Sequence, residues 1–150
     1  MKRYVYLVLT IIWTIVIFLF SGQSGSTSSD TSHGFVNSLV NIYEKVSGKD
    51  VDNESIVKAL NHPVRKTAHF VEFFILGVLV FLFIDTFDMN KKIIISILFC
   101  FIIACCDEFH QMFSINRGPG IIDVLIDTFG GVAAIAILGR KIIYDYFKKA

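Results

Sequence analysis

The sequence predicts an all-α integral membrane protein: a four-helix bundle of membrane spans with an amphipathic helix in the external loop between spans 1 and 2. Hydrophobic residues make up 54% of the chain and charged residues only 18%, and the mean hydropathy of +0.64 is well above that of soluble domains. Four apolar segments also approach the roughly 20 residues that cross a bilayer as a helix. The formal charge of +1 provides no basic field for a polyphosphate backbone, so no nucleic-acid partner is expected.

The predicted spans are residues 4–20, 67–84, 93–113 and 121–143, and they form one membrane domain over residues 1–150. The first span also fits a cleavable signal peptide, because Lys2 and Arg3 precede it and small, polar residues follow it. Its length and the central Trp13 favour an uncleaved anchor.

The distribution of basic residues predicts the orientation. Eight of the 14 Lys and Arg residues lie at the two termini and in the short loop after the second span. They are Lys2, Arg3, Lys91, Lys92, Arg140, Lys141, Lys148 and Lys149. Because Lys and Arg accumulate in short cytoplasmic segments, both termini are expected to be cytoplasmic and residues 21–66 to form a long external loop.

The external loop contains a helical pattern. Four apolar residues recur at helical spacing between a cap at Ser32 and the stop at Gly48. They are Phe35, Leu39, Ile42 and Val46. A second short helix is predicted at residues 53–61, ended by Pro63. Residues 21–32 are rich in Ser, Gly and Thr, which predicts a flexible connector.

Ionisable side chains inside membrane helices are costly, so those within the spans mark a candidate site. In the second span, Arg65, His69 and Glu72 fall within an arc of about 60° on a helix. Two further sets share faces in the same way. They are Asp107, His110 and Gln111, with Glu108 at the edge of their arc, in the third span, and Asp123 with Asp127 in the fourth.

The predicted depths of these sets agree. At 1.5 Å per residue, all three lie in the outer half of the bilayer. The deepest layer is Glu72, Asp107 and Asp127; above it lie His69, His110 or Gln111, and Asp123; and Arg65, Lys66 and Arg117 surround the opening. The inner halves of the spans carry no charge. The sequence therefore predicts a one-sided pocket that faces the exterior.

Four ordered motifs carry a resemblance to a known family. They are FSGQSG at 20–25, VRKTAHFVEFFILG at 64–77, CDEFHQMFSINR at 106–117 and DVLIDTFGG at 123–131. Together they resemble the VanZ-like family of small bacterial membrane proteins over roughly residues 7–138. One departure is Phe at 73 or 74, where the family often has an aromatic hydroxyl.

The resemblance implies four spans in the bacterial cell membrane and a role in the cell envelope. The founding member of the family is associated with low-level resistance to teicoplanin, a lipid-bearing glycopeptide. The resemblance supplies no reaction, so the chemistry has to come from the residues.

Several functions can be built from these residues. An enzyme would act on a membrane lipid or lipid-linked cell-wall precursor with an anionic head group. Its catalytic candidates are His69, Glu72, Asp107, His110 and Asp127, and its substrate-binding candidates are Gln23, Arg65, Lys66, Glu108, Gln111, Arg117 and Asp123. A non-catalytic protein that binds or shields the head group, or a lipoglycopeptide, is the main alternative. Two further alternatives remain. The protein could be a transporter, or the polar residues could serve only to hold the helices together.

A bound metal also remains open. The spacings HxxE and DxxH each place two ligands on one helical face, which gives His69, Glu72, Asp107 and His110 as a candidate divalent-metal set. None of the functions above requires a cofactor.

Overall fold

The computed structural model describes residues 1–23, 25–48, 53–89, 91–114 and 120–149, and this part of the chain forms five helices and no strand. The helices are α1 (Lys2–Ser21), α2 (Gly25–Ser47), α3 (Asn53–Asp85), α4 (Lys92–Gln111) and α5 (Ile121–Lys149). The predicted all-α class is confirmed.

Four of these helices are long and apolar enough to cross a membrane. The apolar stretches are Lys2–Ser21, Glu54–Asp85, Lys92–Gln111 and Ile121–Arg140. A 20-residue helix is about 30 Å long, which matches the hydrocarbon core of a bilayer. Large apolar side chains such as Ile12, Leu98 and Ile137 are exposed on these helices, as expected for surfaces that contact lipid.

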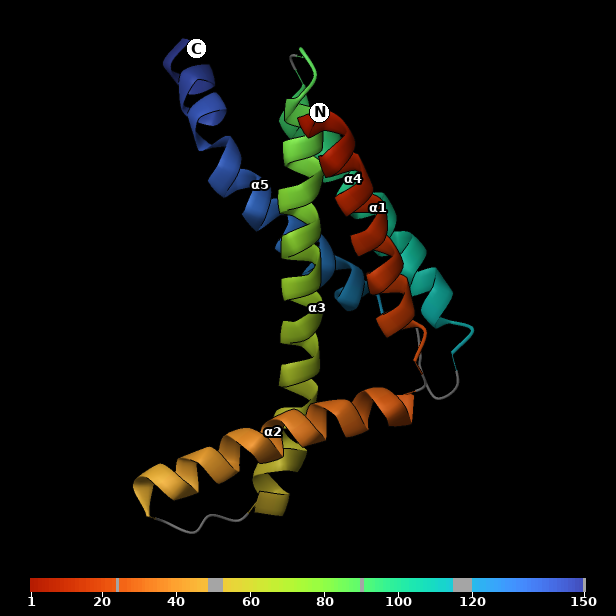
Figure 1. The fold of residues 1–150 in the computed structure, drawn as a ribbon, viewed down its shortest axis with the longest axis vertical. Helices are drawn as coiled ribbons and strands as arrows, with labels where there is room; N and C mark the ends of the chain where they lie inside the picture. Colours follow the sequence, from red (N-terminus) through yellow and green to blue (C-terminus); the bar gives the residue numbers. More distant parts are fainter. Residues whose placement is uncertain (24, 49–52, 90, 115–119, 150) are drawn as a thin grey trace.

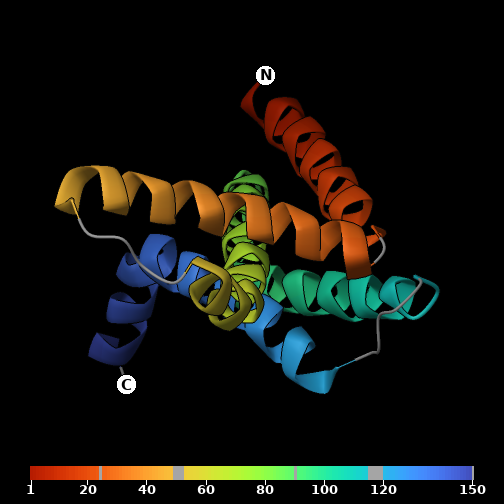
Figure 2. The ribbon, with the colours of Figure 1, turned by 90° about the horizontal axis from the view of Figure 1, so that it is seen from below.

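Helix α3 is the centre of the fold, because it packs against each of the other four helices. Helix α3 follows the long axis and α1, α4 and α5 run obliquely to it, whereas α2 lies crosswise at one end (Figure 1). We call this end the α2 end. Both termini lie at the opposite end (Figure 1), and the view from the α2 end shows α2 crossing α3 (Figure 2).

The prediction that Pro63 ends a short helix is wrong. Helix α3 is continuous through Pro63, so the short helix at 53–61 and the second span are one element. Packing explains this continuity: Val36 and Val40 of α2 pack in one cluster with Val57 and Val64, which flank the proline. Contacts on both sides of Pro63 offset the hydrogen bond that its missing N–H cannot make.

The predicted flexible connector at residues 21–32 is also wrong for most of its length. Helix α2 begins at Gly25, well before Ser32. The Asn61 side-chain amide of α3 donates a hydrogen bond to Ser29 Oγ at 2.6 Å, and Ser32 is buried. Contacts with α3 therefore hold residues of low helix propensity in a helix.

Close packing between α3 and α5 depends on glycine. A Cβ atom on Gly77 would lie 2.6 Å from the carbonyl oxygen of Gly131, and a Cβ on Gly130 would overlap the carbonyl oxygen of Phe70. Small residues let membrane helices approach closely, which is how such helices gain van der Waals contact. Glycine contacts therefore hold α3 against α5 at the level of the polar side chains.

Candidate polar site at the α2 end

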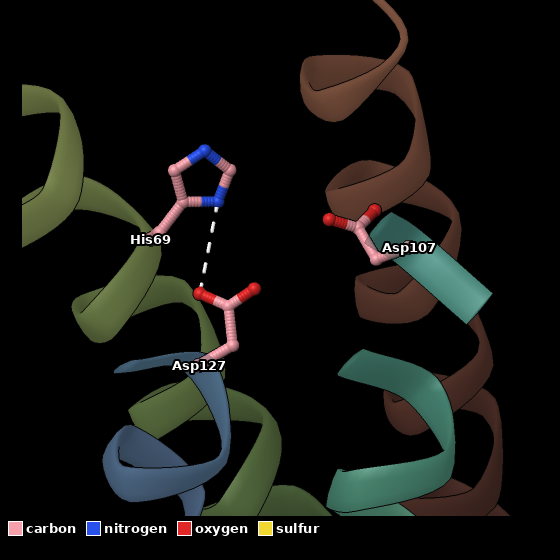
Figure 3. Close-up of side chains that lie close together, drawn as sticks. All are labelled: His69, Asp107 and Asp127. Carbon is pink, nitrogen blue, oxygen red and sulfur yellow. Dashed lines mark ion pairs between the residues drawn. The ribbon is translucent and has the colours of Figure 1, made fainter. Parts of the chain in front are cut away.

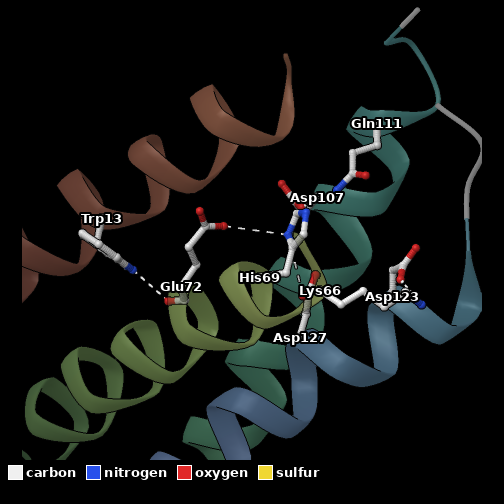
Figure 4. Close-up of polar contacts among 8 residues, drawn as sticks. All are labelled: Trp13, Lys66, His69, Glu72, Asp107, Gln111, Asp123 and Asp127. Carbon is white, nitrogen blue, oxygen red and sulfur yellow. Dashed lines mark hydrogen bonds and ion pairs between the residues drawn. The ribbon is translucent and has the colours of Figure 1, made fainter. Parts of the chain in front are cut away.

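Helical periodicity brings the predicted polar side chains together. His69 and Glu72 lie one turn apart on α3, and they face Asp107 of α4 and Asp127 of α5 (Figure 4). Asp107 and Asp127 are buried, with exposed fractions of 0% and 1%. His69 and Glu72 keep about a fifth of their side-chain surface exposed.

His69 is the centre of this cluster. Its Nδ1 lies 3.8 Å from Glu72 Oε2 and 3.9 Å from Asp127 Oδ1 (Figure 4). One nitrogen or oxygen atom from each of His69, Asp107 and Asp127 lies within 4.8 Å of the others (Figure 3). Three helices therefore place an imidazole and two carboxylates around one small volume.

Neighbouring polar contacts fix the cluster in place. The Gln111 side-chain amide donates to Asp107 Oδ2 at 2.9 Å, one turn away on α4. Trp13 Nε1 of α1 donates to the backbone carbonyl of Glu72 at 2.9 Å (Figure 4). An indole N–H that is shielded from water needs an acceptor, so this bond of the half-buried Trp13 also fixes the depth of α1 relative to Glu72.

Two other predicted site residues connect the helices near the same end. Lys66 Nζ of α3 pairs with Asp123 Oδ1 of α5 at 3.1 Å (Figure 4). Glu108 accepts a hydrogen bond from the backbone N–H of Gly120, so it joins the end of α4 to the start of α5. Lys66 and Glu108 therefore each make a contact with another segment of the protein.

A cavity of about 240 Å³ adjoins the cluster. Its lining brings together the end of α1, the first half of α2 and one face of α3. The lining residues are Phe20, Gln23, Thr31, Ser32, Arg65, Ala68, His69 and Glu72. Gln23, Arg65, His69 and Glu72 are among the predicted site residues, whereas the sequence predicts Thr31 in the connector and Ser32 at a helix cap. Their position emerges only when α2 packs across α3.

Arg65 is the cation of this lining. It is half-buried, and it forms no ion pair with any other described residue. Glu72 lines the same cavity but lies beside His69. The cavity therefore contains a guanidinium group, a planar donor that can bind an anion through two parallel N–H groups.

A second, larger hollow of about 510 Å³ continues along α2 and α3. It shares Thr31, Ser32, Ala68 and Glu72 with the cavity. Its remaining lining is Phe35, Val64, Thr67 and Val71, which is mainly apolar. A polar cavity and an apolar groove are thus adjacent at the α2 end.

His110 lines neither the cavity nor the His69 cluster. His110 is exposed and makes an edge-on contact with Phe18, with ring centroids 5.7 Å apart, beside Gly22. The C-terminal part of α1 packs on this side of α4, so His110 faces α1. Arg117 lies outside the described residues.

The four sequence motifs meet at this end of the molecule: Gln23 follows α1, Arg65 and His69 lie on α3, Asp107 on α4 and Asp127 on α5. A family model described as VanZ/LLP1 matches residues 6–143, nearly the whole chain. The chain belongs to the VanZ-like family. Comparison of this VanZ-like chain with curated proteins and with solved structures found no match.

Proposed function

We propose that this VanZ-like membrane protein binds an anionic, lipid-linked head group at the α2 end. The single observation that carries the proposal is the junction of the Arg65 cavity with the apolar groove along α2 and α3. An amphiphile needs a polar site and an apolar site in contact, and four lining residues common to both hollows supply that contact. The head group occupies the cavity and the hydrocarbon chain follows the groove.

The position of α2 supports entry from the lipid phase. Val36 and Val40 face α3, whereas Phe35, Leu39 and Val46 on the adjoining sector are exposed. A helix with such a wide apolar sector and a polar opposite face lies in the membrane interface. An amphiphile in that leaflet therefore reaches the groove without passing through water.

We infer that the α2 end faces the exterior of a bacterial cell membrane, because the basic residues accumulate at the other end. In this setting the ligand is a membrane lipid or a lipid-linked cell-wall precursor. Binding such a precursor, or a lipoglycopeptide itself, is how the protein would contribute to resistance against drugs such as teicoplanin.

The orientation is tested by labelling Asn41→Cys on α2 in a chain whose three native cysteines are replaced by alanine. A membrane-impermeant maleimide is expected to label this cysteine in intact cells. A matched Asp88→Cys variant, in the loop between α3 and α4, should be labelled only after permeabilisation. The reverse pattern would place the α2 end in the cytoplasm and contradict the external site.

The ligand class is tested by offering purified protein an equimolar mixture of a polyprenyl phosphate and phosphatidylcholine. Retained lipid is measured by native mass spectrometry. We expect at least about tenfold preference for the polyprenyl phosphate, which corresponds to about 1.4 kcal/mol. Equal retention would contradict an anionic head-group site.

The same measurement separates binding from catalysis. His69 between two carboxylates is an arrangement suited to general acid–base chemistry, which favours an enzyme as the second candidate function. Conversion of the bound phosphate ester during incubation would indicate an enzyme. Recovery of the intact lipid would indicate a protein that binds or shields it.

A further inference from the structure

We propose that His69, Asp107 and Asp127 bind a divalent transition-metal ion of the Zn²⁺ or Mn²⁺ class. This three-helix set differs from the set that the sequence suggested, because Asp127 takes the place of His110 and Glu72 lies beside the ligands. The metal site does not depend on the head-group proposal, because it needs only these three side chains.

The geometry suits a small ion. One ligand atom from each residue lies within 4.8 Å of the other two. Ligands about 2.0–2.1 Å from a tetrahedral Zn²⁺ lie roughly 3.4 Å apart, so small side-chain rotations bring these atoms into coordination. An imidazole with two carboxylates is a mixed nitrogen and oxygen donor set, which favours Zn²⁺ or Mn²⁺ over the all-oxygen sites of Ca²⁺.

Asp127 supplies an independent reason for a cation. Its side chain is 1% exposed, and its Oδ1 accepts no hydrogen bond from the described residues. His69 Nδ1 lies 3.9 Å from this oxygen, which is beyond hydrogen-bond distance, and no described Lys or Arg pairs with Asp127. A carboxylate in a membrane helix is costly without compensation, and a bound cation provides it.

The surroundings of the ligands also fit a metal site. The Gln111 amide orients Asp107 through Oδ2, as hydrogen bonds commonly orient metal-binding carboxylates. Three protein ligands leave at least one coordination position open, as in catalytic zinc sites. His69 also lines the Arg65 cavity, so the ion would lie next to that cavity.

The test is metal binding by the purified full-length protein in detergent. After chelation and removal of the chelator, Zn²⁺ or Mn²⁺ is titrated, and bound metal is measured by plasma mass spectrometry together with the thermal unfolding temperature. We expect about one ion per chain and a rise in unfolding temperature on binding. A wild-type protein that binds neither metal overturns the proposal, and the two carboxylates then share a proton.

Matched variants identify the ligands. Asp127→Asn removes a ligand with little change in shape, and Asp123→Asn makes the same change one turn away at the Lys66 pair. We expect Asp127→Asn to weaken binding at least about tenfold and Asp123→Asn to bind as the wild type does. Equal binding by the two variants overturns the assignment.

A second measurement, the absorption spectrum of bound Co²⁺, reports on the ligands directly. Co²⁺ bound to the wild-type chain should give a visible absorption band that changes in His69→Gln and in Asp107→Asn. An identical band in wild type and both variants would place the ion elsewhere and contradict the site.

Discussion

Arg65→Ala is expected to lower the affinity for a polyprenyl phosphate about 10- to 150-fold. Hydrogen bonds to charged groups contribute about 1.5–3 kcal/mol, and about 1.4 kcal/mol corresponds to a factor of ten. Arg65 lines the cavity and forms no ion pair within the described part of the chain, so the proposed anionic head group would be its charged partner. Native mass spectrometry of the retained lipid measures the effect.

The control is Lys66→Ala, which removes the same charge from the next residue of α3. Lys66 pairs with Asp123 and does not line the cavity, so its loss should change lipid affinity much less than the loss of Arg65. Similar losses in both variants would mean that general electrostatic attraction, and not the cavity, binds the lipid.

The Arg65→Ala variant can also be tested in cells. If the protein protects a susceptible bacterium against a lipid-tailed glycopeptide, Arg65→Ala should abolish protection at normal protein abundance. Full protection by Arg65→Ala would separate resistance from head-group binding in this cavity.

Gly130→Ala is expected to destabilise the protein by about 1–3 kcal/mol, because the new methyl group would overlap the backbone oxygen of Phe70. Backbone atoms cannot move aside as a flexible side chain can, so α3 and α5 must separate. Reversible unfolding in mixed detergent micelles measures the free-energy change.

Gly34→Ala is the matched control. Gly34 lies in α2 with no atom within 4 Å of an added Cβ, so alanine there should be neutral or should stabilise the helix by up to about 1 kcal/mol. Equal effects at Gly34 and Gly130 would contradict close glycine packing between α3 and α5.

Glu72→Gln addresses the alternative in which the polar residues only hold helices together. It removes a charge with little change in shape, while the glycine contacts of α3 and α5 remain. We expect a free energy of unfolding near that of the wild type. A loss as large as that of Gly130→Ala would favour a structural role for the carboxylate.

Much of the candidate site could be predicted from helical phase and depth alone. His69, Glu72, Asp107 and Asp127 lie together as the periodicity of their three helices predicts, because a regular helix fixes which residues share a face. His110 could not be placed in this way. A helical face about 100° wide can contact more than one neighbouring helix, and the position of α1 brings His110 against Phe18.

By itself, the sequence determined the four apolar helices, the all-α class and the family, because hydrophobic length and motif order are local properties of the chain. Only the tertiary structure decided that α3 continues through Pro63 and that α2 begins at Gly25. Both outcomes depend on contacts between α2 and α3, which override local propensity. The same contacts place Thr31 and Ser32 beside Arg65 and so form the cavity, which no single segment encodes.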